Sequence, residues 1–104
     1  MKKKAFKMTL YQGQITEYKK RHNPIWEELK SVLKAHGVYN YSIFFDEETH
    51  TLFGYAELES DEKWKTIANT DICKKWWEFM SDIMKTNPDN GPVSVELTNV
   101  FYLK

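Results

Sequence analysis

The chain has 104 residues, and its 15 Lys plus Arg balance its 15 Asp plus Glu, so the formal charge at pH 7 is zero. That balance argues against nucleic acid or an anionic membrane surface as the main partner, because both attract a basic excess. Hydrophobic residues make up 41% of the chain, which is too apolar for a disordered protein. The longest apolar run, residues 52–56, is far shorter than the roughly 20 residues that a bilayer requires. We therefore expect a single α+β domain over residues 1–104.

Cys73 is the only cysteine, which excludes an intramolecular disulfide and a cysteine-based zinc site. The basic residues 1–4 are followed by Ala5-Phe6-Lys7-Met8, where a lysine interrupts any hydrophobic segment of a signal peptide. A small chain with one thiol and no such signal is expected in the cytoplasm.

Apolar residues alternate with polar ones over residues 5–10, which predicts a half-buried strand. Spacings of three and four between apolar residues then predict a helix over residues 15–22. The pattern resumes after Pro24, which is tolerated at the first position of a helix, and Asn23 is a good N-cap. We therefore expect a second helix over residues 24–36, ended by Gly37.

Residues 39–58 read as two alternating strands joined by a polar turn, so they predict a β-hairpin. Ser60 and Thr70 each precede a helical pattern and are predicted to cap two further helices. Residues 87–92 carry the strongest turn signals of the chain and predict a loop. Alternation over residues 93–103 predicts a last strand, with a slip in the middle that is typical of a β-bulge.

The resulting order, β-α-β-β-α-β, predicts a ferredoxin-like sandwich: a four-stranded antiparallel sheet with helices on one face. The open face is unusual, because Phe44 alternates with Tyr41 and Ile43 and leaves the strand apolar on both sides. A solvated face would be polar. We therefore expect a second copy of the chain to cover this face in a homodimer. The alternative is a monomer in which the loop at 85–92 folds over the sheet.

His22 is the most interesting titratable residue of the chain. It follows Tyr18 by four residues, so the two side chains are neighbours on one helix face. It also directly precedes the break at Asn23-Pro24, where a helix end leaves space for a ligand. An imidazole titrates near pH ~6.5, which suits a general acid or base. The alternative is a hydrogen-bonded structural histidine at a helix end.

The chain has more aromatic residues than one small hydrophobic core is expected to contain. Trp76 and Trp77 differ by about 100° around a helix, so one can enter the core while the other faces elsewhere, for example towards a sugar. Tyr39 and Tyr41 are expected on one face of a strand, where a phenol can donate or accept a hydrogen bond. Plain packing is the alternative for all four residues. Cys73 is expected to be buried and inert.

Five segments, taken together and in order, resemble the L-rhamnose mutarotase family. The resemblance spans essentially the whole chain, and differences such as Glu27 and Gly91 lie outside the positions that matter. The segments are Glu17–Trp26, His36–Tyr41, Thr70–Trp77, Asn87–Asn90 and Val100–Leu103.

The resemblance implies a dimeric α+β barrel and a cofactor-free isomerase that interconverts the α and β anomers of L-rhamnose. It implies that His22 is the proton donor and that Tyr18, Tyr41, Trp76 and Trp77 bind the sugar. Ring opening needs a proton at the ring oxygen and the loss of one from the anomeric hydroxyl, without a metal, redox group or covalent nucleophile. If the His22 imidazolium is the acid, activity falls as pH rises. The base is open between a water held by a tyrosine and a carboxylate.

Two other functions remain open at this point. The same fold hosts small monooxygenases and haem-binding proteins, so fold alone does not decide the activity. Such a protein would reveal its ligand by colour after purification. The third reading is a non-catalytic sugar-binding module, which would bind sugar saturably without changing anomer exchange. Neither the exact sugar preference nor a contribution of the partner subunit to each site follows from the sequence.

Overall fold

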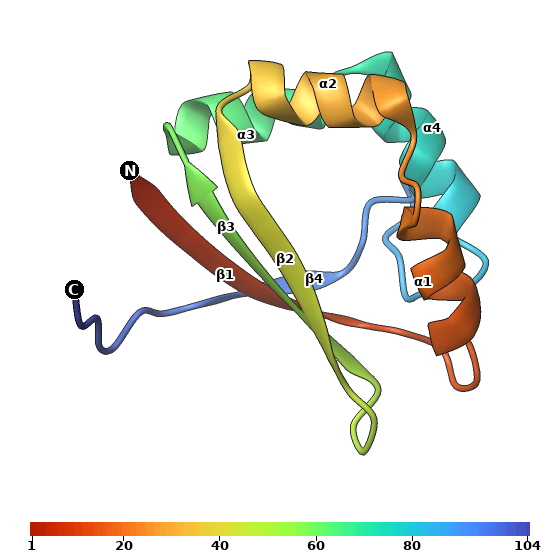
Figure 1. Cartoon of the computed structure of the whole chain (residues 1–104). Coiled ribbons are helices and arrows are strands. Elements are labelled where there is room, and N and C mark those ends of the chain that lie inside the picture. The colour runs from red at the N-terminus through yellow and green to blue at the C-terminus, as the bar shows by residue number, and fades with distance from the viewer.

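The computed structural model describes residues 1–104 as a four-stranded antiparallel sheet whose helices all lie on one face (Figure 1). The strand order is β2-β3-β1-β4, which confirms the ferredoxin-like prediction. None of the helices combines the length and the hydrophobicity of a membrane-spanning segment. In chain order the elements are β1 (Lys2–Thr9), α1 (Ile15–His22), α2 (Glu27–Ala35), β2 (Val38–Asp46), β3 (Thr51–Leu58), α3 (Asp61–Ile67), α4 (Asp71–Met80) and β4 (Ser94–Leu97).

The core lies between the sheet and the helices. On β1, Phe6 and Met8 face the helices and are only 6% exposed, opposite Gly54 and Leu52 of β3. A Cβ at Gly54 would come within 2.5 Å of the Phe6 ring, so the glycine makes room for this large side chain. Burial of these apolar faces is the main stabilising contribution to the arrangement.

The link between α1 and α2 differs from the prediction. Residues 23–26 are not helical, and α2 begins only at Glu27. Asn23 does not cap α2, because its Nδ2 donates to the carbonyl of Lys19, 2.8 Å away, at the end of α1. The Asn23–Pro24 peptide bond is cis. Gly37, at φ +76°, follows α2 in the left-handed conformation, as predicted.

The predicted hairpin is confirmed, but the prediction that Tyr39 and Tyr41 lie on the same face of its first strand is wrong. The pairing of β2 with β3 shifts between Tyr39 and Ser42, and Asn40 adopts φ +44°. One extra residue at a β-bulge reverses the side on which the next residues point. Tyr39 and Tyr41 therefore lie on opposite faces: Tyr41 packs against the core, whereas Tyr39 is 43% exposed.

Both predicted helix caps are confirmed. The Ser60 hydroxyl accepts from the Lys63 backbone N–H at 3.2 Å, and the Thr70 hydroxyl accepts from that of Cys73 at 3.4 Å. Cap hydrogen bonds satisfy backbone donors that have no partner within the helix. The second cap fixes where α4 begins, and hence the orientation of the two tryptophans it carries.

The last strand is shorter than predicted, because β4 ends at Leu97 instead of running to residue 103. Only three residues of β1 precede Ala5, the partner of Leu97, so little strand remains for further pairing. The tail instead extends away from the helices (Figure 1). Its Tyr102 ring lies 3.3 Å from the Lys3 Nζ, while Val100 is 92% exposed.

The open face of the sheet carries exposed apolar side chains, as predicted. Phe44 is 66% exposed and Val95 is 52% exposed, and both lie on the face away from the helices. The loop at 85–92 does not cover this face. Its Gly91 instead packs against the indole of Trp77 on the helix side. The alternative of a monomer with this loop folded over the open face is therefore wrong, and Phe44 and Val95 stay exposed within one chain.

Candidate active site

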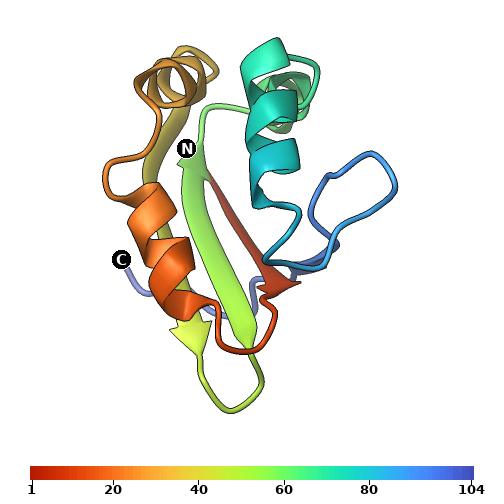
Figure 2. The same cartoon turned by 90° about the vertical axis from the view of Figure 1, so that its right-hand side faces the viewer.

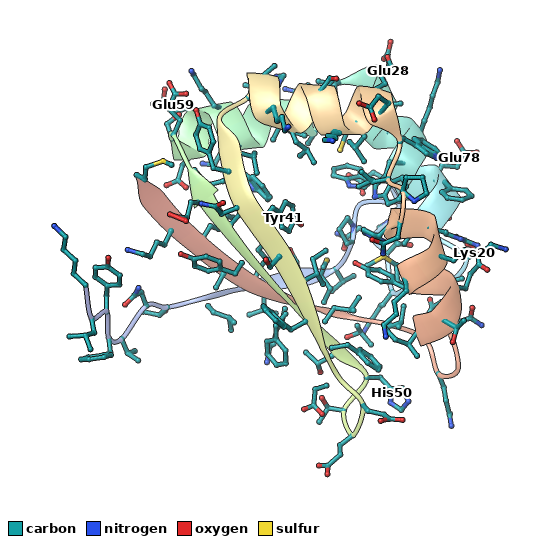
Figure 3. The ribbon with its side chains drawn as sticks, in the orientation of Figure 1. Lys20, Glu28, Tyr41, His50, Glu59 and Glu78 are labelled. Carbon is teal, nitrogen blue, oxygen red and sulfur yellow. The ribbon has the colours of Figure 1, made fainter.

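A cavity of about 1110 Å³ lies between the helices and the sheet. Its wall is mostly apolar, and exposed residues such as Lys19, Asn87 and Asp89 form part of its lining, so it opens to solvent. Figure 3 shows the Tyr41 side chain pointing from β2 into the space between the sheet and the helices. Concave, largely apolar sites with a few polar groups are typical of small-molecule binding. All five residues predicted for the site line this cavity: Tyr18, His22, Tyr41, Trp76 and Trp77.

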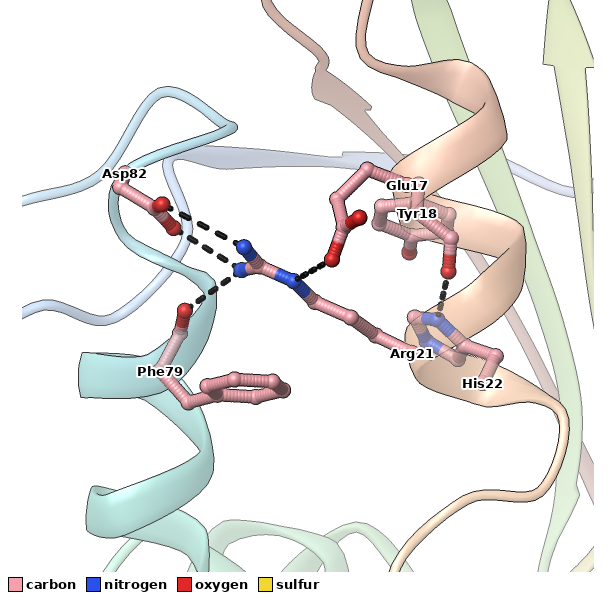
Figure 4. Close-up of polar contacts among 6 residues, drawn as sticks. All are labelled: Glu17, Tyr18, Arg21, His22, Phe79 and Asp82. Atoms are coloured by element: carbon pink, nitrogen blue, oxygen red, sulfur yellow. Dashed lines mark hydrogen bonds and ion pairs between the residues drawn. The ribbon is translucent and has the colours of Figure 1, made fainter.

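His22 lies in the last turn of α1, with its ring nitrogens in different situations. Nδ1 is 2.8 Å from the backbone carbonyl of Tyr18, which can only accept a hydrogen bond (Figure 4). Nδ1 must therefore carry the proton that it donates. In the neutral ring this leaves Nε2 with a lone pair, and Nε2 has no hydrogen-bond partner in the chain.

Aromatic side chains enclose the imidazole. The ring stacks on Tyr18 with a centroid separation of 4.3 Å, and it lies perpendicular to the Trp76 ring with a centroid separation of 5.1 Å. This burial lowers the pKa of His22 below its ordinary value of 6.5, while the hydrogen bond to the Tyr18 carbonyl opposes the shift. His22 forms no ion pair that would reverse the effect. The resting imidazole is therefore neutral at pH 7.

Tyr18 and Tyr41 supply the phenol groups of the cavity. Burial raises the pKa of both well above the ordinary value of 10.0, so both keep their protons at neutral pH. Neither phenol oxygen forms a hydrogen bond within the chain. Each O–H group is therefore free to donate to a ligand hydroxyl or ring oxygen.

Trp76 and Trp77 both border the cavity, although they pack against different halves of the core. Trp76 lies against the cluster that contains Met8 and Tyr18, and Trp77 lies against the one that contains Val38. Both indoles are partly exposed, so neither is a plain core residue. This arrangement differs from the expectation that one of the two would enter the core while the other faced elsewhere.

Three further aromatic residues escaped the sequence analysis: Trp64 lines the cavity, whereas Trp26 and Phe79 do not line it but pack against Trp76. Trp26 stacks on Phe79 at 5.2 Å and meets Trp76 edge-on at 5.1 Å. Trp64 lies 6.0 Å from the Tyr41 ring and lines the cavity. The helix predicted over residues 24–36 included Trp26, but α2 begins one residue after it, at Glu27.

The remaining candidates play other parts. His36 bonds the Val32 carbonyl at 2.8 Å and His50 lies near Phe45, and neither lines the cavity. Cys73 is buried, as predicted, and its burial raises the pKa of the thiol to about 11. The nucleophilic thiolate is therefore negligible at neutral pH.

The fold and the cavity together define a class: small ferredoxin-like α+β proteins with a cavity for a small molecule between their helices and their sheet. Within that class, a half-buried imidazole with two phenols and several indoles suits a polar, uncharged ligand with an apolar edge.

Comparisons with known proteins identify the family. A family profile described as L-rhamnose mutarotase matches residues 3–103. The chain is 61% identical to the L-rhamnose mutarotase of Lachnoclostridium phytofermentans, over 99% of both chains. It superimposes on the crystal structure of the L-rhamnose mutarotase of Formosa agariphila with a TM-score of 0.92 and 52% identity, over the whole of both chains. The chain belongs to the L-rhamnose mutarotase family.

More distant structures share the fold alone. A putative antibiotic biosynthesis monooxygenase from Nitrosomonas europaea matches 97% of this chain and 100% of its own with a TM-score of 0.64, at 10% identity. A dimeric ferredoxin-like protein from an uncultured marine organism matches 98% and 96% with a TM-score of 0.67, at 18% identity. At such low identities a shared fold does not indicate a shared activity, so a monooxygenase function is not favoured.

Proposed function

We propose that this protein is an isomerase that interconverts the α and β anomers of L-rhamnose, by general acid–base opening and reclosure of the pyranose ring. The observation that carries the proposal is the state of His22 in the cavity. Its Nδ1 is held by the Tyr18 carbonyl, its Nε2 is free, and its ring is neutral at rest. Such a group can take a proton and return it within one catalytic cycle.

The proton steps follow from that state. Nε2 accepts the proton of the anomeric hydroxyl while the C1–O5 bond breaks and its electron pair passes to O5. The imidazolium formed in this way then donates the proton to O5, which leaves the open-chain aldehyde and a neutral histidine. In this scheme His22 is the proton donor to the ring oxygen, as the family resemblance implies, but it acquires the proton from the sugar itself.

Reclosure on the other face completes the exchange. Rotation about the C1–C2 bond presents the opposite face of the aldehyde to O5, and the same steps run in reverse. The phenols of Tyr18 and Tyr41 hold their protons, so they donate hydrogen bonds to sugar oxygens and do not act as bases. Trp76 and Trp77 offer ring faces to the C–H surface and the methyl group of the sugar.

The proposal includes a homodimer that works in the cytoplasm. The exposed apolar side chains of the open sheet face, Phe44 and Val95 among them, support a second copy packed there. The dimeric ferredoxin-like relative described above is consistent with that assembly. The chemistry of a sugar-metabolising enzyme and the single buried thiol support the cytoplasm.

Exchange NMR on equilibrated L-rhamnose tests the proposed activity directly. Saturation of one anomeric proton should transfer to the other in the presence of the protein, at a rate proportional to protein concentration and above that of the free sugar. Saturable binding without faster exchange would favour a sugar-binding module. A faster exchange for another 6-deoxyhexose than for L-rhamnose would change the assigned substrate but not the reaction.

A further inference from the structure

Arg21 joins the helix that carries His22 to the end of the helix that carries Trp76. Its Nε donates to Glu17 at 2.7 Å, and its NH1 donates to the backbone carbonyl of Phe79 at 2.7 Å (Figure 4). The same guanidinium forms a two-pronged contact with Asp82, at 2.9 and 3.3 Å.

The low exposure of the Arg21 side chain and its contact with the Phe79 ring favour these hydrogen bonds. The Arg21 side chain is only 11% exposed, and its guanidinium carbon lies 4.4 Å from the centre of the Phe79 ring. Arginine pairs with a carboxylate through two parallel hydrogen bonds, which adds geometric specificity. The last turn of α4 contains no basic residue of its own. Arg21 therefore brings a positive charge to the negative end of α4 from another helix.

This bridge is the only polar connection between α1 and α4. No other hydrogen bond or ion pair joins residues 15–22 to residues 71–82. Figure 2 shows the two helices on either side of the middle of the sheet. Their side chains meet at the cavity, where the rings of His22 and Trp76 are 5.1 Å apart. The contacts of Arg21 consequently join the two helices whose side chains meet at the cavity.

We infer that Arg21 is a positioning residue for anomer exchange: it holds α1 against the end of α4 and thereby fixes the imidazole of His22 opposite the Trp76 indole. The residue touches neither the sugar nor the transferred protons. Its effect comes through geometry, because a displacement of about 1 Å between a catalytic group and its substrate can cost on the order of 10²-fold in rate. The inference rests on the proposed role of His22 in proton transfer.

Arg21→Met tests the bridge, because the apolar side chain keeps much of the packing but loses every polar contact. We expect kcat for anomer exchange to fall by about 10- to 100-fold. We also expect the His22 pKa, followed by NMR of the imidazole without sugar, to rise towards its ordinary value as water enters between the helices. Lys63→Met is the matched control, since it removes an exposed helical ion pair with Glu59 outside the site. It should change neither quantity.

Two further variants keep the test decisive if Arg21→Met folds poorly. Asp82→Asn weakens the contact from the α4 side and should shift kcat and the His22 pKa in the same directions, by smaller amounts. Arg21→Lys keeps a charge but not the two-pronged geometry, and should recover melting temperature more fully than kcat. A lower melting temperature with parental kcat and parental His22 pKa in all three variants would overturn the inference. Because the pKa is read without sugar, its outcome does not depend on whether L-rhamnose is the substrate.

Discussion

Tyr18 contacts His22 twice, once through its backbone and once through its ring. The Tyr18 carbonyl accepts from Nδ1 at 2.8 Å, and its phenol ring stacks on the imidazole at 4.3 Å. The spacing of four residues on α1 produces both contacts, because such residues are neighbours on a helix. One residue therefore sets the tautomer of the imidazole, shields it from water and brings a phenol group to the same cavity.

The phenols are expected to contribute hydrogen bonds to the sugar. Tyr18→Phe and Tyr41→Phe should each lower kcat/KM for anomer exchange by about 3- to 10-fold, the range of one neutral hydrogen bond. Tyr39→Phe is a suitable control, because this tyrosine lies on the opposite face of β2 and outside the cavity. Equal losses in Tyr39→Phe and Tyr41→Phe would contradict the assignment of Tyr41 to the sugar.

The pH dependence of activity should follow the neutral form of His22. Since burial lowers its pKa below 6.5, the imidazole is neutral at pH 7 and becomes protonated only in more acidic solution. We expect kcat/KM to level off towards neutral and higher pH and to fall below the His22 pKa, approaching tenfold per pH unit. A profile that instead falls as pH rises through neutrality would show that a resting imidazolium is the acid. Initial rates of polarimetric equilibration in overlapping buffers provide the measurement.

The burial of His22 should also make the free energy of unfolding depend on pH. The unfolded chain binds a proton at His22 near pH 6.5, whereas the folded chain binds it only at lower pH. The free energy of unfolding should therefore be unaffected by His22 above pH 6.5 and should fall as pH drops through the interval between the two pKa values. In His22→Gln, urea unfolding curves between pH 5 and 7 should lose this part of the acid sensitivity. An unchanged pH dependence would mean that burial does not perturb the imidazole.

The open sheet face should hold the dimer together. Phe44→Glu places a charge on an exposed aromatic position of that face and should shift the mass measured by light scattering from dimer to monomer at micromolar concentration. Lys30→Glu, an exposed change on α2, should leave the mass unaltered. A monomeric parent protein would refute the homodimer outright.

Much of the fold follows from local signals in the sequence. The Ser60 and Thr70 caps, the hairpin and the loop at 87–92 all lie where capping chemistry, alternation and turn residues predict them. Asn23 shows the limit of such reasoning, since the side chain that could cap α2 instead bonds back to α1. The choice between the two helix ends depends on how the chain packs, which local propensity does not contain.

The site could be predicted only in part, because some of its contacts depend on tertiary packing and not on local spacing. Spacing along one helix brings Tyr18 and His22 together, so their contact was predictable. Tyr39 was placed on the wrong face because a bulge at Asn40 reverses the alternation, and nothing nearby in the sequence marks it. The bridge from Arg21 to Asp82 joins residues 61 positions apart and arises only from tertiary packing.

The central claim is that the His22 imidazole transfers the protons of anomer exchange, and His22→Gln tests it most directly. The amide can still bond the Tyr18 carbonyl but cannot carry a proton between sugar oxygens. In saturation-transfer NMR on L-rhamnose, the folded variant should exchange anomers about 10²- to 10⁴-fold more slowly than the parent. His36→Gln, outside the cavity, should exchange at the parental rate. A folded His22→Gln protein with parental exchange would contradict the account.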